Sequence, residues 1–432
     1  MYYAKNWELM YDPISSSPYL VTNYPPIYPV IAGTLNRIFD NIFFSSRLLS
    51  ITSAISIAGL ISSIVYKESA NDSIIIGIIS GLLFLFSSIT SEWGMYARVD
   101  ILGVCFGVSA IFWYLTQRGR SQLIGAALFS LLALFTKQSL FAAPAAIFLA
   151  MIFEKEFKRA IRFAVGLGTV GLSLLAGLTY VSEGQAWIHL VTYNQNSFSF
   201  YRMFATTKTQ LIDYHPILLG IASATVLRYF DEIPRVLVFY FLTGGLPSLL
   251  VGKVGSGPNY FLRALVGMTI LFGIFLSKSQ FDKVVSNINS NSQKSVSVLI
   301  AVLVIIQFSL FVAPPSGAMA GADNADSIIE KSDEPILSED SGLLVNNNQN
   351  VLYQPFIMRQ LTISGEWNQK PVVQSIQNEH YEYIVLHFDV ADEEDWSTSR
   401  WSPDQIQAVD ENYQLVDNSG KYWVYRPKAD SS

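Results

Sequence analysis

Four ionisable side chains stand at or near the ends of apolar runs, where charges can do chemistry at a membrane surface. Arg98 and Asp100 lie in Ala-Arg-Val-Asp, Lys137 lies in Thr-Lys-Gln-Ser, and Arg263 follows Pro-Asn-Tyr-Phe-Leu. Because an ionisable group at the edge of hydrocarbon is costly, such residues predict a functional site. The three cations suit an anionic group.

Each of these residues also has a plain structural interpretation. Arg98 and Asp100 suit a local ion pair at the start of a span. Lys137 suits a lysine whose stem lies along apolar surface while its ammonium reaches water. Arg263 suits an ordinary arginine at a span end, so the sequence leaves both interpretations open.

Further candidates are polar or aromatic residues near the ends of apolar runs or in the loops between them. Glu92 precedes Trp93, and an aromatic ring beside a carboxylate suits a sugar, although interfacial tryptophans are also routine. No Cys/His cluster has the spacing of metal ligands, so His189 alone does not indicate a metal. The other candidate binding residues are Tyr24, Gln138, His189, Asn194, Asn259 and Tyr260.

Composition predicts a polytopic membrane protein. Of 432 residues, 51% are hydrophobic and 14% charged, with a mean hydropathy of +0.33. Soluble domains carry about 25% charged residues. The single cysteine, Cys105, excludes an intrachain disulfide. Gly-Ser-Gly at 255–257 is not preceded by the strand that a nucleotide-binding phosphate loop requires. No nucleic-acid partner is expected.

Charge divides the chain into two regions. Residues 315–432 hold 20 acidic and 7 basic residues, a balance of −13, whereas the remainder holds 14 and 21, a balance of +7. Such asymmetry indicates different surroundings. We expect a multi-span transmembrane domain at 46–314, a linker at 315–325 and a small soluble acidic α/β domain at 326–432.

Ten apolar runs are candidate transmembrane helices, and a perpendicular helix needs about 20 residues to cross. The two short runs on either side of Lys137 form either two spans or one broken re-entrant hairpin. The runs are 46–66, 73–90, 98–117, 121–136, 139–153, 160–182, 215–229, 234–251, 261–277 and 295–314.

The distribution of Lys and Arg sets the expected orientation. Twelve fall in one set of alternating loops and nine in the other, which includes the N-terminal segment. The positive-inside rule places the first set in the cytoplasm. Both termini, the longer loops 183–214 and 252–260, and the four charges at 98, 100, 137 and 263 then face outward from a cell membrane.

Residues 1–45 are expected to form an outer N-terminal segment. Tyr-Pro-Pro-Ile-Tyr-Pro at 24–29 leads into an amphipathic stretch ending at Asn41, which suits a helix lying in the interface. An outer start with no preceding span suggests that one N-terminal helix is missing. A protein with ten spans and an outer N-terminus is the alternative.

Short patterns in the tail predict its elements. Leu337, Leu343–Val345 and Tyr383–Phe388 are candidate strands. Ser402 followed by proline predicts a helix start. Residues 413–425, with Asn-Ser-Gly at 418–420, predict a hairpin.

Several short motifs together resemble the GT-C membrane glycosyltransferases, in particular the prokaryotic dolichyl-phosphate-mannose protein mannosyltransferase-like group (family 39). The resemblance covers most of 1–314, and the tail is similar to soluble tails of some archaeal and bacterial members. The motifs are Tyr-Pro-Pro-Ile-Tyr-Pro, Ala-Arg-Val-Asp, Phe-Thr-Lys-Gln-Ser, Gly-Pro-Asn-Tyr-Phe-Leu-Arg, and, in the tail, Pro355-Phe, Gly365-Glu-Trp and Asn412-Tyr.

The resemblance implies transfer of a sugar from a polyprenyl- or dolichyl-phosphate donor to a glycan, lipid or protein acceptor at the outer membrane face. An acidic residue acts as general base on the acceptor hydroxyl. Cationic side chains hold the lipid phosphate as its charge grows. No cofactor or divalent metal is implied with certainty.

This sequence departs from the family at its N-terminus. The usual acidic residue follows a first span upstream of Tyr-Pro-Pro, and it is expected to lie before Met1 here. The candidate catalytic carboxylates within the chain are Glu8, Asp12, Glu92 and Asp100.

Two other classes of function remain open. A transporter or lipid flippase would show midplane charges, inverted repeats and interrupted spans. Here the span interiors are almost free of charge and no internal repeat is evident, which disfavours transport. A non-catalytic membrane subunit with a partner-binding outer domain is the third possibility.

Overall fold

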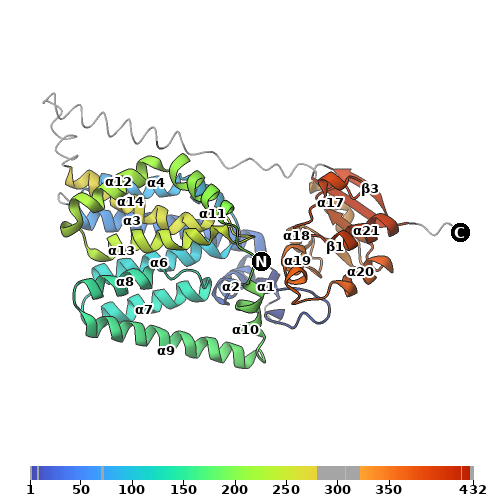
Figure 1. Cartoon of the computed structure of the whole chain (residues 1–432), viewed down its shortest axis with the longest axis horizontal. Helices are drawn as coiled ribbons and strands as arrows, with labels where there is room; N and C mark the ends of the chain where they lie inside the picture. Colours follow the sequence, from blue (N-terminus) through green and yellow to red (C-terminus); the bar gives the residue numbers. More distant parts are fainter. Residues whose placement is uncertain are drawn as a thin grey trace. The chain divides into compact units, whose positions relative to one another are not determined.

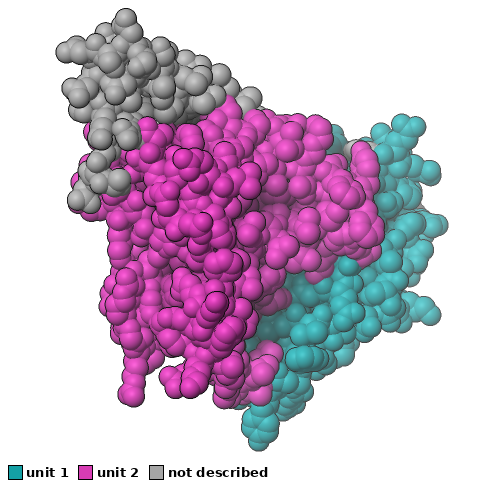
Figure 2. All heavy atoms as spheres, turned by 60° about the vertical axis from the view of Figure 1, so that its left-hand side comes forward, with its two compact units in different colours: residues 1–23, 178–196, 316–432 teal, residues 24–177, 197–315 magenta. Residues whose placement is uncertain are grey.

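The chain divides into two compact units in a computed structural model. The structure describes residues 2–6, 9–69, 73–279, 307, 322–419 and 421–428. One unit comprises residues 1–23, 178–196 and 316–432, and the other comprises 24–177 and 197–315. They are coloured teal and magenta in Figure 2 and are called here the sheet unit and the helical unit.

The helical unit is a bundle of apolar helices (Figure 1). Its α-helices are α2 (Ile27–Phe39), α3 (Ile42–Glu68), α4 (Ile74–Leu85), α5 (Ser88–Trp93), α6 (Val99–Thr116), α7 (Gly119–Thr136), α8 (Ala142–Phe153), α9 (Phe157–Val181, whose last residues belong to the sheet unit), α11 (Phe200–Thr207), α12 (Pro216–Tyr229), α13 (Arg235–Gly245) and α14 (Leu262–Lys278). Shorter turns are η3 (Lys208–Asp213, a π-helix) and the 3-10 segments η4 (Phe230–Glu232), η5 (Leu246–Gly252) and η6 (Pro258–Phe261).

Six helical segments of the described residues are long and apolar enough to cross a membrane. They are Ile42–Glu68, Val99–Thr116, Gly119–Thr136, Phe157–Val181, Arg235–Gly252 and Pro258–Lys278. Each has at least 18 residues, which at 1.5 Å per residue nearly covers a hydrocarbon core of about 30 Å. The structure therefore confirms an apolar multi-span helical domain.

The expected count of ten spans is not confirmed. Helices α4 and α8 have 12 residues each, and α12 has 14. Run 73–90 is interrupted because Ser87 lies in extended backbone and caps α5, accepting a hydrogen bond from Thr90 N at 3.2 Å. The two runs flanking Lys137 are separate helices, only the first of span length. The tenth run, 295–314, lies outside the described residues apart from Gln307.

Helix α14 is the centre of the helical unit, and 15 of its 17 residues are buried. Glycines allow its neighbours to approach closely. A Cβ added at Gly267 would lie 2.8 Å from Phe241 Cα on α13, and one at Gly273 would lie 2.7 Å from Val65 Cγ1 on α3. In contrast, α9 runs along the lower edge of the bundle in Figure 1 and buries only Ala160 and Phe163.

The sheet unit contains a mixed four-stranded sheet in the order β1-β2-β4-β3. Strand β1 (Ile336–Ser338) is parallel to β2 (Tyr383–Leu386), β2 is antiparallel to β4 (Tyr422–Pro427), and β4 is antiparallel to β3 (Tyr413–Ser419). Its helices are α1 (Tyr2–Lys5), α10 (Gln185–Leu190), η2 (Thr192–Asn194), α17 (Ala322–Ile329), α18 (Ser341–Asn346), α19 (Pro355–Ser364), α20 (Lys370–Gln377), η7 (Glu393–Asp395) and α21 (Pro403–Asn412).

Most of the elements predicted in the tail are confirmed. The strands at Leu337 and 383–386, the helix after Ser402 and the hairpin at 413–425 are present, and Ser402 and Gln405 form a reciprocal capping box. The predicted strand at Leu343–Val345 is wrong, because these residues belong to helix α18. Asp340 starts this helix, since its carboxylate accepts hydrogen bonds from Gly342 N and Leu343 N.

The N-terminal segment contributes to the same unit. Ile14 and Val21 are part of its apolar core. Trp367 Nε1 donates to Ile14 O at 3.2 Å, and Val21 N donates to Gln354 Oε1 at 2.8 Å. The predicted amphipathic helix is present as α2, which belongs to the helical unit. Of the expected linker, residues 315–321 lie outside the described residues and α17 begins at Ala322.

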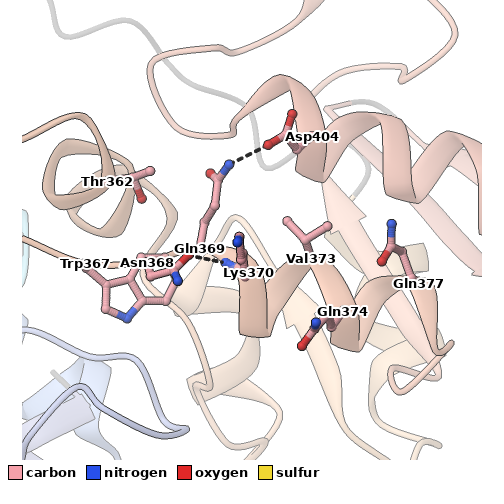
Figure 3. Close-up of a pocket in the computed structure, with 9 residues that line it drawn as sticks. All are labelled: Thr362, Trp367, Asn368, Gln369, Lys370, Val373, Gln374, Gln377 and Asp404. Atoms are coloured by element: carbon pink, nitrogen blue, oxygen red, sulfur yellow. Dashed lines mark hydrogen bonds between the residues drawn. The ribbon is translucent and has the colours of Figure 1, made fainter. Parts of the chain in front are cut away.

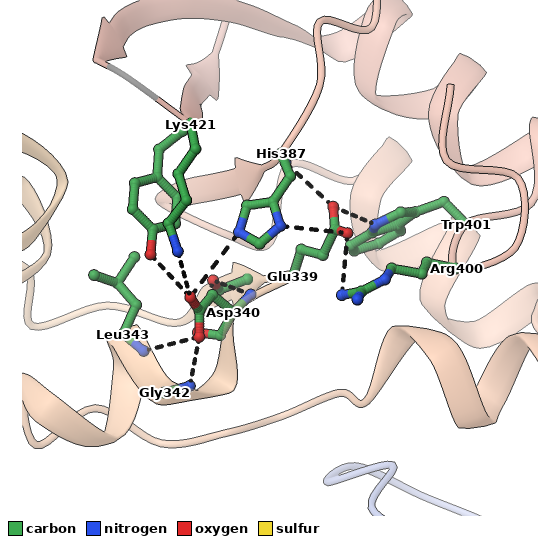
Figure 4. A network of polar contacts seen from close by, with 10 residues as sticks. Glu339, Asp340, Gly342, Leu343, His387, Arg400, Trp401 and Lys421 are labelled. Atoms are coloured by element: carbon green, nitrogen blue, oxygen red, sulfur yellow. Dashed lines mark hydrogen bonds and ion pairs between the residues drawn. The ribbon is translucent and has the colours of Figure 1, made fainter. Parts of the chain in front are cut away.

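A polar network holds the carboxyl ends of β1 and β2 together (Figure 4). Glu339, whose side chain is almost fully buried, accepts hydrogen bonds from His387 N and Trp401 Nε1 and lies 3.3 Å from Arg400. Asp340 accepts from the Tyr422 hydroxyl at 2.8 Å. This hydroxyl, with Lys421, holds the pKa of Asp340 below its usual value although burial alone would raise it. The buried carboxylates are thus paired and hydrogen-bonded, which offsets the cost of removing them from water.

The close contact at Gly267 generates a test of the packing. Gly267→Ala would force the new methyl group against the backbone of α13, so we expect a loss of about 1–3 kcal/mol in unfolding free energy. Gly59→Ala is the matched control, because nothing lies within 4 Å of a Cβ there. Thermal melting of the purified full chain measures both, and equal melting temperatures would contradict this packing.

Candidate active site

The carboxylate of Asp100 accepts hydrogen bonds from three donors in separate segments of the helical unit. Asp100 lies in the first turn of α6, Lys137 directly follows α7, and Asn259 lies in η6. Lys137 Nζ is 2.7 Å and Asn259 Nδ2 2.6 Å from Asp100 Oδ1, and Arg98 Nε is 3.3 Å from Oδ2. Three of the four charged residues expected at the site, Arg98, Asp100 and Lys137, therefore lie in contact, and Asn259 joins them.

The inner part of this cluster is shielded from solvent. Asp100 and Lys137 are each 3% exposed, and Asn259 is 4% exposed. Removing such charges from water costs several kcal/mol per ion, and close geometry with extra hydrogen bonds offsets that cost. Both carboxylate oxygens of Asp100 are occupied, so its geometry suits holding the cations in place more than accepting a substrate proton.

Arg98 differs from Lys137 because its side chain is 43% exposed. Its backbone is extended just before α6, which turns the side chain back toward Asp100 and over the ring of Trp93, 4.8 Å from the ring centroid. Among the described residues its Nη atoms donate no hydrogen bond. Arg98 is thus fixed on its Nε side, and its partly exposed guanidinium has the geometry to contact an anion on the other side.

Aromatic rings surround the buried cations. Lys137 Nζ lies 4.4 Å from the ring centroid of Tyr260 and 5.4 Å from that of Tyr24. Arg263 lies 5.6 Å from the Tyr260 ring and donates to the backbone oxygens of Tyr260 and Ser139. Cation–π contacts stabilise positive charge in sites with little water. Lys137, Arg263, Tyr24 and Tyr260 therefore form one cationic and aromatic cluster with Asp100.

Sequence reasoning missed Lys253 and the packing role of Trp93. Lys253 is half-buried, and burial together with the charge of Lys137 lowers its pKa. A Cβ at Gly257 would lie 3.0 Å from the Trp93 ring, so glycine lets the 255–260 loop approach this indole. Arg202 donates to Ser256 O and holds the same loop. The glycine-rich, aromatic composition of the loop was the available signal.

Glu92 lies beside this cluster on α5. It is partly exposed, and within the described part of the chain its side chain accepts one hydrogen bond, a long one of 3.5 Å from the Tyr96 hydroxyl. The neighbouring Trp93 contacts both Tyr96 and Arg98. The described residues therefore hold the Glu92 carboxylate with fewer contacts than that of Asp100.

Three further candidates are Glu8, Asp12 and Gln138. Glu8 lies outside the described residues, Asp12 is exposed and belongs to the sheet unit, and Gln138 is exposed after α7. No group of three His, Cys, Asp or Glu side chains in the described ranges could hold a metal ion.

His189 and Asn194 have structural contacts within the sheet unit. His189 is buried, its Nδ1 accepts a hydrogen bond from Thr22 N at 3.0 Å, and burial lowers its pKa to about 4. It is therefore neutral near pH 7. Asn194 Nδ2 donates to the backbone oxygens of Asn23 and Leu190. Both residues tie the 185–194 segment to the N-terminal segment.

Comparison with known proteins decides the fold. No family model matches this sequence, and no curated protein matches it. The structure is similar to ArnT from Cupriavidus metallidurans in the apo state, with a TM-score of 0.64 at 12% identity over 98% of this chain and 92% of ArnT. This chain has the fold of the GT-C membrane glycosyltransferases.

Two further GT-C structures agree. ArnT bound to undecaprenyl phosphate matches with a TM-score of 0.62 at 12% identity over 96% of this chain and 90% of ArnT. The apo oligosaccharyltransferase of Archaeoglobus fulgidus matches with a TM-score of 0.57 at 11% identity over 97% of this chain and 68% of that enzyme. The GT-C fold expected from the motifs is confirmed, and the narrower assignment to family 39 stays a prediction.

The buried pair generates a prediction about stability. Lys137→Met leaves Asp100 buried without its strongest partner, so we expect a loss of about 3–5 kcal/mol. Asp100→Asn together with Lys137→Met removes both charges and should recover most of that loss. Thermal melting of the two single variants and the double variant measures the coupling. Additive losses would show that the pair does not interact as described.

Proposed function

We propose that this protein is an integral-membrane glycosyltransferase that moves a sugar from a polyprenyl-phosphate donor to an acceptor hydroxyl at the outer membrane face. The observation that carries the proposal is Arg98, which is anchored by Asp100 and Trp93 and whose Nη atoms donate no hydrogen bond to another described residue. The GT-C fold supports the class of reaction, and the ArnT neighbour bound to undecaprenyl phosphate supports the class of donor.

The charge balance of the cluster favours an anionic ligand. Arg98, Lys137, Lys253 and Arg263 stand against the single carboxylate of Asp100 in this cluster. One phosphate group would offset much of this excess. Arg98 would contact the phosphate directly, while the buried Lys137 would contribute mainly through its field, since its Nζ is committed to Asp100.

The proposed reaction needs both a cation and a base. The bond between the anomeric carbon and the phosphate oxygen breaks as the acceptor oxygen attacks the anomeric carbon. Negative charge grows on the departing polyprenyl phosphate, where fixed positive charge stabilises it. The acceptor hydroxyl gives its proton to a carboxylate. Among the described residues beside the cluster, Glu92 is proposed for this role.

The orientation expected from the loops completes the proposal. The protein would be a multi-pass component of the cell membrane, with the cluster and the sheet unit on the outer side. Its acceptor would be a glycan, a lipid or a protein carrying a free hydroxyl. A family 39 member would transfer mannose.

Arg98 is tested by lipid binding. Losing a hydrogen bond to a charged group costs about 1.5–3 kcal/mol, so Arg98→Ala should weaken undecaprenyl phosphate binding roughly 10- to 100-fold. Native mass spectrometry of the full chain measures this binding. Arg47→Ala is the control, since Arg47 is exposed on the same unit and contacts the Phe43 ring. Equal weakening in both variants would contradict a specific role for Arg98.

Glu92 is tested by transfer. Glu92→Gln should leave undecaprenyl phosphate binding unchanged and slow sugar transfer from polyprenyl-phosphate hexoses in membranes about 10²- to 10⁴-fold, the usual contribution of a general base. Normal transfer in this variant would exclude Glu92 as the base. Translocation of the lipid phosphate without any sugar transfer by the native protein would favour a flippase instead.

A further inference from the structure

We propose that a pocket in the sheet unit binds a neutral carbohydrate. The pocket has a volume of about 380 Å³ and lies among the end of α19, the turn that follows it, helix α20 and the start of α21 (Figure 3). This volume lies at the small end of the range for ligand sites, about 300–1,000 Å³. It therefore suits a short saccharide.

One face of α20 forms one wall of the pocket. Lys370, Val373, Gln374 and Gln377 follow the spacing i, i+3, i+4, i+7, which places them on one side of a helix. Val372 and Ile376 are buried on the opposite side and fix the rotation of the helix. The core packing of α20 thus turns two glutamine side chains toward the pocket.

Amide groups dominate the hydrogen-bonding capacity of this wall. Gln374 and Gln377 make no side-chain hydrogen bond to other described residues, whereas Gln369 Nε2 donates to Asp404 Oδ2 at 2.8 Å. Each free amide offers two donors and a carbonyl acceptor. A sugar hydroxyl both donates and accepts, so adjacent hydroxyls match such amides without requiring charge.

The charge of the segment also favours a neutral ligand. Residues 367–378 contain five amide side chains and no Asp or Glu, although residues 315–432 carry 20 acidic residues. The pocket itself contains one basic and one acidic residue, Lys370 and Asp404. An anionic ligand would meet a surrounding domain with a balance of −13.

Trp367 supplies an apolar surface at one end of the pocket (Figure 3). Its indole is held in place because Nε1 donates to Ile14 O and its ring contacts the ring of Tyr19 edge-on at 5.2 Å. A rigid aromatic ring covers the C–H face of a sugar at low entropic cost. The amides can therefore bond the hydroxyl groups of a saccharide while the fixed indole covers its C–H face.

Binding of a carbohydrate in this pocket does not depend on the transfer reaction. A carbohydrate pocket in a glycosyltransferase would suit a glycan-bearing acceptor or product, and that role rests on the proposed function. Binding of free sugar rests only on the pocket. The experiment therefore measures binding alone.

The test uses the purified full chain in a membrane mimetic without sugar head groups, since maltoside detergents would compete. The probes are cellobiose, mannobiose and N,N′-diacetylchitobiose, observed by saturation-transfer difference NMR. We expect at least one to bind and Gln374→Ala/Gln377→Ala to weaken it about 10-fold or more, as expected for two lost hydrogen bonds. Gln414→Ala, an exposed amide on β3 outside the pocket, should leave binding unchanged.

Two results would overturn the inference. One is the absence of binding by all three saccharides at 50-fold excess in a protein that still binds undecaprenyl phosphate, which would leave the proposed function intact. The other is saccharide binding unchanged in the double variant. Both glutamines are exposed, so their replacement is expected to preserve the fold, and an unchanged melting temperature checks this.

Discussion

The carboxylate of Asp100 is the point on which the candidate site depends. It sits at the start of α6 and accepts hydrogen bonds from Lys137 after α7 and Asn259 in η6, while Arg98 pairs with its second oxygen. Water is excluded from the inner pair, so each partner needs the other to offset its desolvation. One buried anion therefore holds three cationic and polar groups in fixed positions and leaves Arg98 available at the surface.

Glycines and aromatic rings support this arrangement. Gly257 brings its loop against Trp93, whose ring also lies under the Arg98 guanidinium. Tyr24 and Tyr260 face Lys137, and Arg263 extends the same aromatic environment from the start of α14. Among the six described candidate spans, the one that contains α14 is the most deeply buried, so Arg263 is attached to a tightly packed helix.

The sheet unit uses different chemistry. Its surface is rich in acidic residues, and its buried charges are paired at the carboxyl ends of β1 and β2 (Figure 4). The amide-rich face of α20 is an exception to both patterns. The helical unit thus carries a cationic cluster, whereas the sheet unit carries an amide-rich pocket with one basic and one acidic residue.

The sequence by itself identified charged residues of the site, the apolar runs and several elements of the tail. Such features can be read from the sequence because hydrophobic periodicity and helix capping act over a few residues. One local pattern was misleading: Leu343–Val345 read as a strand, but Asp340 caps a helix there. His189, a candidate binding residue, is buried and accepts a hydrogen bond from Thr22 N, a contact across 167 positions that local patterns do not encode. Only the tertiary structure could bring Asp100 to Asn259, 159 positions away, since that contact depends on how α6, α7 and η6 pack.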